Sequence, residues 1–147
     1  MHMIDIQTTL EKRRNEIYDE NEKHLMGFVR WLENKGLSQK TIKTHVTNVE
    51  FYINDYLGYD LLDVSHGCRK IDSFLGNWFI RKAAWSSCAH IKSFASSFKK
   101  FYAYLLEKNV VSNEDYDDLC EIIKEHMQDW LEKMKRYEDM LFADYYY

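Results

Sequence analysis

The stretch that decides the fold is SSCAHIKSFASSFKKFYAYLLEK, residues 86–108. Its apolar residues recur at helical spacing, which predicts an amphipathic helix with one side in a core. That stripe consists of Ile91, Phe94, Ala95, Phe98, Phe101, Tyr102 and Leu105. Ser86 or Ser87 is the expected N-cap, because a serine oxygen accepts hydrogen bonds from the free N–H groups of a first turn. The opposite face is small and basic, with His90, Ser93, Ser96, Ser97 and Lys100, and with Lys92 and Lys99 at its margins.

The composition extends this helical prediction to the whole chain. The 147 residues include no proline and only five glycines, so few residues interrupt a helix. The length suits one domain with one core. The sequence therefore predicts an all-α fold in a single helical domain, residues 1–147.

The preceding helices meet at NKGLSQKTIKTH, residues 34–45. A first helix is expected from near Thr8 or Thr9, with the polar run at 19–22 as a point where it could divide in two. Gly36 fits a left-handed C-cap, and Ser38 fits the N-cap of a second helix that ends near residue 58. Residues 59–69 read as a connection, and a short helix follows with Ile71, Phe74, Leu75 and Trp78 on one side.

A long helix is predicted at the C-terminal end. Ser112 and Asp115 have the spacing of a capping box. The apolar residues that follow alternate spacings of four and three, as in a heptad seam: Tyr116, Cys120, Ile123, Met127, Trp130, Met134, Tyr137 and Leu141. A helix over 114–141 would be roughly 40 Å long. Its far half must therefore lie along the N-terminal helix or meet a partner.

Charge is divided unevenly along the chain, whose net charge is −4. Residues 111–147 hold 4 Lys or Arg against 11 Asp or Glu, whereas residues 67–104 hold 7 Lys or Arg against Asp72 alone. A basic middle followed by an acidic end can be an ordinary solvated surface, or it can mark a surface for an anionic partner.

The order of these motifs resembles the N-terminal core-binding domain of tyrosine recombinases, the phage integrase family. The segment FVRWLENKGLSQKTIKTHVTNVEFYINDYL, residues 28–57, matches the first half through its aromatic–Leu, Gly-Leu-Ser and Thr elements. LLDVSHGCRKIDSFLGNWFI, residues 61–80, is similar to the family's connection and short helix, and residues 86–111 resemble its fourth helix. The resemblance covers about residues 22–111, and the helix at 112–142 is an addition to it.

The resemblance implies a small orthogonal, SAM-like helical bundle that grips duplex DNA with its second and fourth helices. Transferred to this chain, it implies DNA contacts from Lys40, Thr41, Lys43 and Thr44, and from Ser86, Ser87, His90, Lys92, Ser93, Ser96, Ser97, Lys99 and Lys100. Lysines and hydroxyls bind mostly phosphate oxygens, which position a duplex without reading its sequence. An alternative is a protein–protein interaction module, in which 114–141 forms a homodimer or docks on a recombinase.

The catalytic domain of the family is not matched, so we expect no enzymatic activity. His66-Gly67-Cys68-Arg69 repeats a catalytic His-x-x-Arg only as text, because it lies in a connection of the wrong domain. The terminal Tyr145, Tyr146 and Tyr147 are read as a frayed end rather than as a nucleophile.

Other kinds of site are disfavoured. Cys88-x-His90 supplies two potential ligands, which is too few for a metal site, and no glycine-rich phosphate loop occurs. We therefore expect no cofactor. The three separated cysteines fit reduced thiols, and no segment has the length and apolarity of a signal peptide or a membrane span. A cytoplasmic protein without a membrane partner is expected.

Overall fold

The computed structural model describes residues 3–83 and 86–146, with side chains to residue 143. These ranges form helices and connecting turns and contain no strand, which confirms the all-α class. The contacts divide the chain into two compact units, residues 1–67 and residues 68–147. The boundary falls inside the segment 22–111 that the resemblance treats as one bundle. The SAM-like arrangement stays a prediction.

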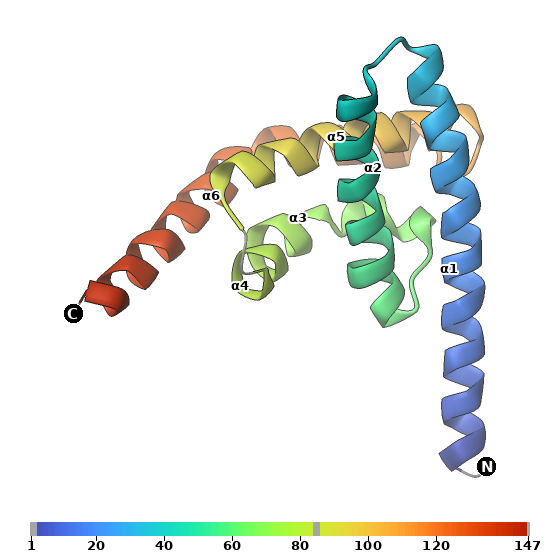
Figure 1. The fold of residues 1–147 in the computed structure, drawn as a ribbon, viewed down its shortest axis with the longest axis horizontal. Coiled ribbons are helices and arrows are strands. Elements are labelled where there is room, and N and C mark those ends of the chain that lie inside the picture. The colour runs from blue at the N-terminus through green and yellow to red at the C-terminus, as the bar shows by residue number, and fades with distance from the viewer. Residues whose placement is uncertain (1–2, 84–85, 147) are drawn as a thin grey trace. The chain divides into compact units, whose positions relative to one another are not determined.

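Unit 1 is built on two helices that run side by side in opposite directions (Figure 1). Helix α1 spans Met3–Asn34 and α2 spans Gln39–Glu50. The chain continues from α2 into a π-helical segment, η1 (Phe51–Leu57), and a 3₁₀ segment, η2 (Gly58–Asp60). A second 3₁₀ segment, η3 (Val64–Arg69), contains the boundary between the two units. Figure 1 also shows that the first turns of α1 extend beyond α2, and residues 3–13 are exposed.

The polar run at 19–22 does not divide α1, and the helix starts at Met3 rather than near Thr8. Asn21 is buried, and its Nδ2 donates to the carbonyl of Ile53 at 3.2 Å and to Oδ1 of Asn54 at 2.8 Å. A buried amide is stable when such partners satisfy it. The run therefore contains a polar contact with η1 instead of a break.

The corner between α1 and α2 has the predicted chemistry. Gly36 has a φ of +81°, in the left-handed region that favours glycine. The Leu37 N–H donates to the Leu32 carbonyl at 3.3 Å, which closes the pattern typical of a helix C-terminus. Ser38 then caps α2, because its Oγ accepts the Thr41 N–H at 3.2 Å. The corner and both caps are confirmed.

Unit 2 packs a broken helical run and α5 against α6. The run consists of α3 (Ile71–Ser73), the π-helical η4 (Phe74–Trp78) and α4 (Phe79–Lys82). Helix α5 spans Cys88–Glu107, and its whole predicted stripe is buried. Phe74 and Phe79 pack edge-on against Phe94, with ring centroids 5.4 and 4.8 Å apart. Aromatic rings in this geometry add stability beyond the area that they bury.

Helix α6 spans Asn113–Tyr146 and lies antiparallel to α5 (Figure 1). The predicted capping box is present: Ser112 Oγ accepts the Asp115 N–H at 3.1 Å, and an Asp115 carboxylate oxygen accepts the Ser112 N–H at 3.2 Å. The seam of α6 packs within unit 2, on α5 and on residues 71–82. Ile123, Trp130 and Met134 are buried, but Leu141 at its end is 50% exposed.

Trp130 anchors α6 to the broken run. Its indole Nε1 donates to Oδ1 of Asp72 at 2.7 Å, and its side chain is fully buried. Gly76 allows this close approach, since a Cβ there would lie 2.9 Å from Cδ1 of Trp130. Contacts within unit 2 thus cover most of the predicted seam of α6.

Candidate nucleic-acid interface

The first predicted surface lies on α2. Lys40, Thr41, Lys43 and Thr44 are all exposed, while Ile42 on the opposite side is buried. Thr41 Oγ1 accepts a hydrogen bond from Ser38 Oγ at 3.0 Å, so the proton of Thr41 is still able to bind an anion. Thr44 differs, because its hydroxyl donates to the Lys40 carbonyl at 3.2 Å. The donors that α2 offers to an anion are therefore its two lysines and Thr41.

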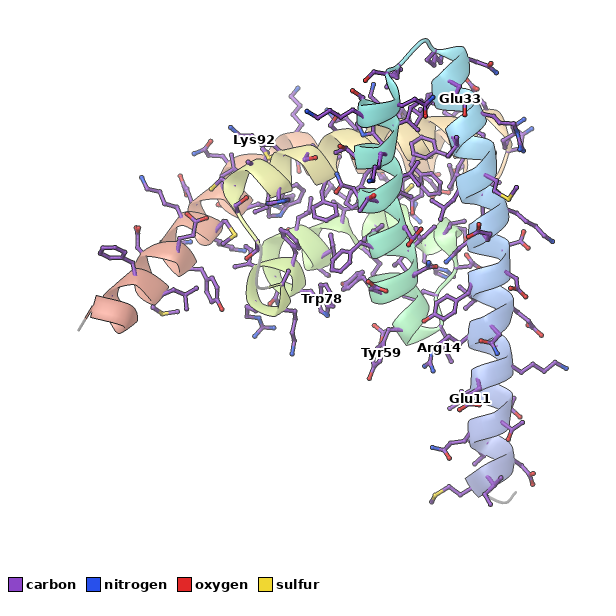
Figure 2. All side chains as sticks on the ribbon, viewed as in Figure 1. Glu11, Arg14, Glu33, Tyr59, Trp78 and Lys92 are labelled. Atoms are coloured by element: carbon purple, nitrogen blue, oxygen red, sulfur yellow. The ribbon has the colours of Figure 1, made fainter. Side chains whose placement is uncertain are left out.

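The second predicted surface lies on α5. His90, Lys92, Ser96 and Lys99 are exposed, and Figure 2 shows Lys92 pointing away from the helix. Ser86, Ser87, Ser93 and Lys100 are partly exposed. Lys92, Ser96 and Lys99 are three to four residues apart, so they follow one face of the helix. This face carries no carboxylate before Glu107.

Ser97 does not belong to this surface, which corrects the prediction. It is 0% exposed and lies among the buried residues of α5. Its position was readable from the sequence, since residue 97 follows Phe94 by three and precedes Phe101 by four. That spacing places it on the buried stripe.

Two other serines are occupied by local structure. Ser87 caps α5: its Oγ accepts the His90 N–H at 3.2 Å and lies 2.7 Å from His90 Nδ1. Ser86 Oγ donates to the Ile80 carbonyl at 3.3 Å. These serines shape the start of α5 rather than offering unused donors.

The five lysines of the two surfaces form no ion pair with an acidic side chain of the described residues. They are Lys40, Lys43, Lys92, Lys99 and Lys100. Arg69 is a contrasting case, because it binds Asp118 at 3.0 Å and Asp115 at 3.1 Å. An unpaired exposed lysine binds an anion without first breaking an internal contact.

The residues weighed for catalysis or metal binding have other partners. His66 Nδ1 lies 3.3 Å from the Asp63 carboxylate, and Cys88 Sγ lies 3.6 Å from the Leu131 carbonyl. Burial raises the pKa of the Cys68 thiol to about 12, which makes it a poor nucleophile. Among the residues that the structure describes, no three His, Cys, Asp or Glu side chains gather as a metal site would require. Tyr147 lies outside the described residues, as do the side chains of Tyr145 and Tyr146.

One basic feature was missed from the sequence. A hollow of about 270 Å³ in unit 2 is lined by Arg81 of α4 and by Lys133 and Arg136 of α6. The acidic balance of residues 111–147 concealed it, because three of the four basic residues there fall within 133–136. Their local clustering was the available signal.

Comparison of the chain with protein families, with curated proteins and with solved structures finds no match. The resemblance to recombinase core-binding domains therefore stays a prediction. In the described part of the chain, no helix combines the length and apolarity that a membrane crossing needs.

Proposed function

We propose that this protein binds duplex DNA without cleaving it, mainly through phosphate contacts from α2 and α5. The observation that carries the proposal is a set of five lysines, four of them exposed and Lys100 partly exposed, none of which forms an ion pair within the described ranges. The helix surfaces around them are otherwise lined mostly by small polar side chains. DNA presents closely spaced phosphates, and lysines that neutralise them release condensed counterions. Arginine is absent from both surfaces, so paired hydrogen bonds to guanine are not part of the proposal.

A gel-shift assay with the full chain at two salt concentrations tests this function. Duplex binding should weaken steeply with salt, and it should weaken further in Lys43→Glu and in Lys100→Glu. Lys12→Glu in α1 and Lys124→Glu in α6 are matched controls, since they change the same charge at exposed positions outside both surfaces. Failure to bind any duplex at low salt sinks the proposal, as does equal weakening in the controls.

The absence of cleavage is tested separately. Incubation with duplex DNA followed by denaturing electrophoresis should give no covalent protein–DNA adduct. An adduct that disappears on replacing a tyrosine by phenylalanine would overturn the non-catalytic assignment.

A second candidate, a protein–protein interaction module, is favoured by the end of α6. Met140, Leu141 and Phe142 are 54, 50 and 63% exposed, although they follow a buried seam. Light scattering of the full chain and of Leu141→Glu/Phe142→Glu tests it. A dimer that the double substitution converts to a monomer supports this candidate, whereas a monomer in both cases rejects self-association. Removing α6 is not a usable test, because it would remove Trp130 and uncover the core formed by α5 and the run 71–82.

A further inference from the structure

The hollow of about 270 Å³ is lined by residues of α6 and of the broken run 71–82. One wall is formed by Gly76, Asn77, Ile80 and Arg81, and the other by Lys133, Arg136, Tyr137 and Met140. On α6 these residues follow the spacing i, i+3, i+4 and i+7, so one helix face supplies the whole wall. The Trp130–Asp72 hydrogen bond and the close approach of Trp130 to Gly76 hold the two elements together beside the hollow.

The cations of the hollow have no partner in the described structure. Asp129 and Glu132 stand four residues before Lys133 and Arg136, the arrangement that most favours ion pairing along a helix. Nevertheless, no ion pair involves Lys133, Arg136 or Arg81 in the ranges described. Three like charges at one hollow repel one another, and a bound anion relieves that repulsion. Two of the three are arginines, whose planar guanidinium groups match phosphate oxygens in pairs.

The remainder of the lining is apolar or aromatic. Ile80 is buried and Tyr137 is half-buried, while Met140 exposes a flexible thioether. Asn77 adds one amide, which both donates and accepts hydrogen bonds. A ring can pack on Tyr137 and Met140 while a phosphate meets the cations. A free inorganic anion would use only the charged half.

We propose that this hollow binds a nucleotide, with its phosphate held by Arg81, Lys133 and Arg136 and its base packed against Tyr137 and Met140. The ligand is either a free mononucleotide or one nucleotide of a single strand, since both present the same group. The site shares no residue with the proposed duplex-binding surfaces of α2 and α5, and the proposal does not depend on them. Its lining places three cations beside Tyr137 and Met140, which suits one phosphate joined to one base.

Calorimetric titration of the full chain tests the site with four probes: adenosine monophosphate, ribose 5-phosphate, adenosine and a short single-stranded oligonucleotide. Adenosine monophosphate should bind at least tenfold more tightly than ribose 5-phosphate or adenosine. Arg81→Gln/Arg136→Gln should weaken it at least tenfold and Tyr137→Leu about fivefold. Lys12→Gln and Lys124→Gln should leave it unchanged, because both lysines are exposed and lie outside the lining of the hollow. Circular dichroism melting of each variant shows that the fold is retained.

The outcomes separate the two sources and the two proposals. If the oligonucleotide, counted per nucleotide, binds no more tightly than the mononucleotide, the ligand is a free nucleotide. If the oligonucleotide binds more tightly and through the same residues, the ligand is a single strand. No binding of the mononucleotide or the oligonucleotide overturns the proposal, and so does binding that the arginine substitutions leave intact. Equal binding of ribose 5-phosphate overturns the role given to the base. None of the three contradicting results bears on the proposal that α2 and α5 bind duplex DNA.

Discussion

Helices α5 and α6 pack against each other in unit 2, and their inner sides are alike. Each buries a stripe at helical spacing, with Phe94 and Phe98 fully buried on α5 and Trp130 and Met134 fully buried on α6. Their outer sides differ. The exposed face of α5 carries Lys92, Lys99 and no carboxylate before Glu107, whereas residues 111–147 hold 11 acidic and 4 basic residues.

This difference in outer charge shows which features of the two helices folding requires and which it does not. Burial of the two stripes stabilises the unit whatever the outer charges are. Like charges on one helix face repel by a few tenths of a kcal/mol, so mixed charges would serve stability better. Arg69 shows that the acids of α6 do attract cations, since Asp115 and Asp118 both bind it. The separation of charge on α5 therefore fits a surface kept for an external anion.

Removing the shared inner packing has the largest expected effect. Trp130→Ala should lower the free energy of unfolding by about 3–5 kcal/mol, because it leaves a cavity between α6 and the run 71–82. Urea denaturation of the full chain measures this. Trp130→Phe keeps most of the volume but leaves the Asp72 carboxylate without the indole donor, so it should cost about 1–3 kcal/mol. Wild-type stability in Trp130→Ala would contradict the packing described.

Changing the outer face of α5 should alter binding but not folding. Lys92→Glu/Lys99→Glu should weaken duplex binding at least tenfold and reduce the slope of log affinity against log salt by about 2. Fluorescence anisotropy at several salt concentrations measures both quantities. Lys124→Glu on α6 is the matched control and should leave the slope unchanged. Identical slopes in all three proteins would remove α5 from the interface.

The N-caps of the two helices should be of similar value. Ser87→Ala and Ser112→Ala should each lower the free energy of unfolding by about 1 kcal/mol, because each removes the side-chain acceptor of a first-turn N–H. Thermal melting measures the loss. Serine to threonine at the same positions keeps the hydroxyl and should recover most of it. A neutral Ser112→Ala would argue against the capping box.

The smallest expected effect is a loss of stability at low pH through Asp115. The pKa of Asp115 is lowered chiefly by the Ser112 N–H, then by the Ser112 hydroxyl and by the charge of Arg69. A carboxyl with a depressed pKa in the fold adds stability above its unfolded pKa, near 3.9, and loses it as pH falls through the folded value. The melting temperature of wild type should therefore drop more steeply below about pH 4 than that of Asp115→Asn. Parallel curves would contradict this linkage.

Local chemistry made much of the fold predictable. The helix caps make contacts only within a few residues of the chain, so they can be predicted from the sequence. They are Gly36, Ser38, Ser87 and the Ser112–Asp115 capping box. The stripe of α5 was predictable for the same reason, because helical spacing alone defines it. The serine at 97 lies at that spacing too, and its polarity masked its burial.

Long-range contacts explain what was missed. Asn21 bonds to residues more than thirty positions away, so the run 19–22 looked like a break. The covering of the α6 seam depends on Trp130 meeting Asp72 and Gly76, which no local pattern reveals. The hollow at Arg81 and Arg136 arises only when two distant segments meet. The five lysines proposed to bind DNA could be named from the sequence, but only the structure shows that none of them forms an ion pair within the described ranges.

The salt dependence of duplex binding by the full chain tests the central proposal most directly. If all five lysines of α2 and α5 neutralise phosphates, log affinity should fall against log salt with a slope of about −4 to −5. The variant with all five changed to glutamine should lose most of that slope and keep the wild-type melting temperature. A slope that is the same in both proteins, or no binding at about 50 mM salt, would contradict DNA binding through these two helices.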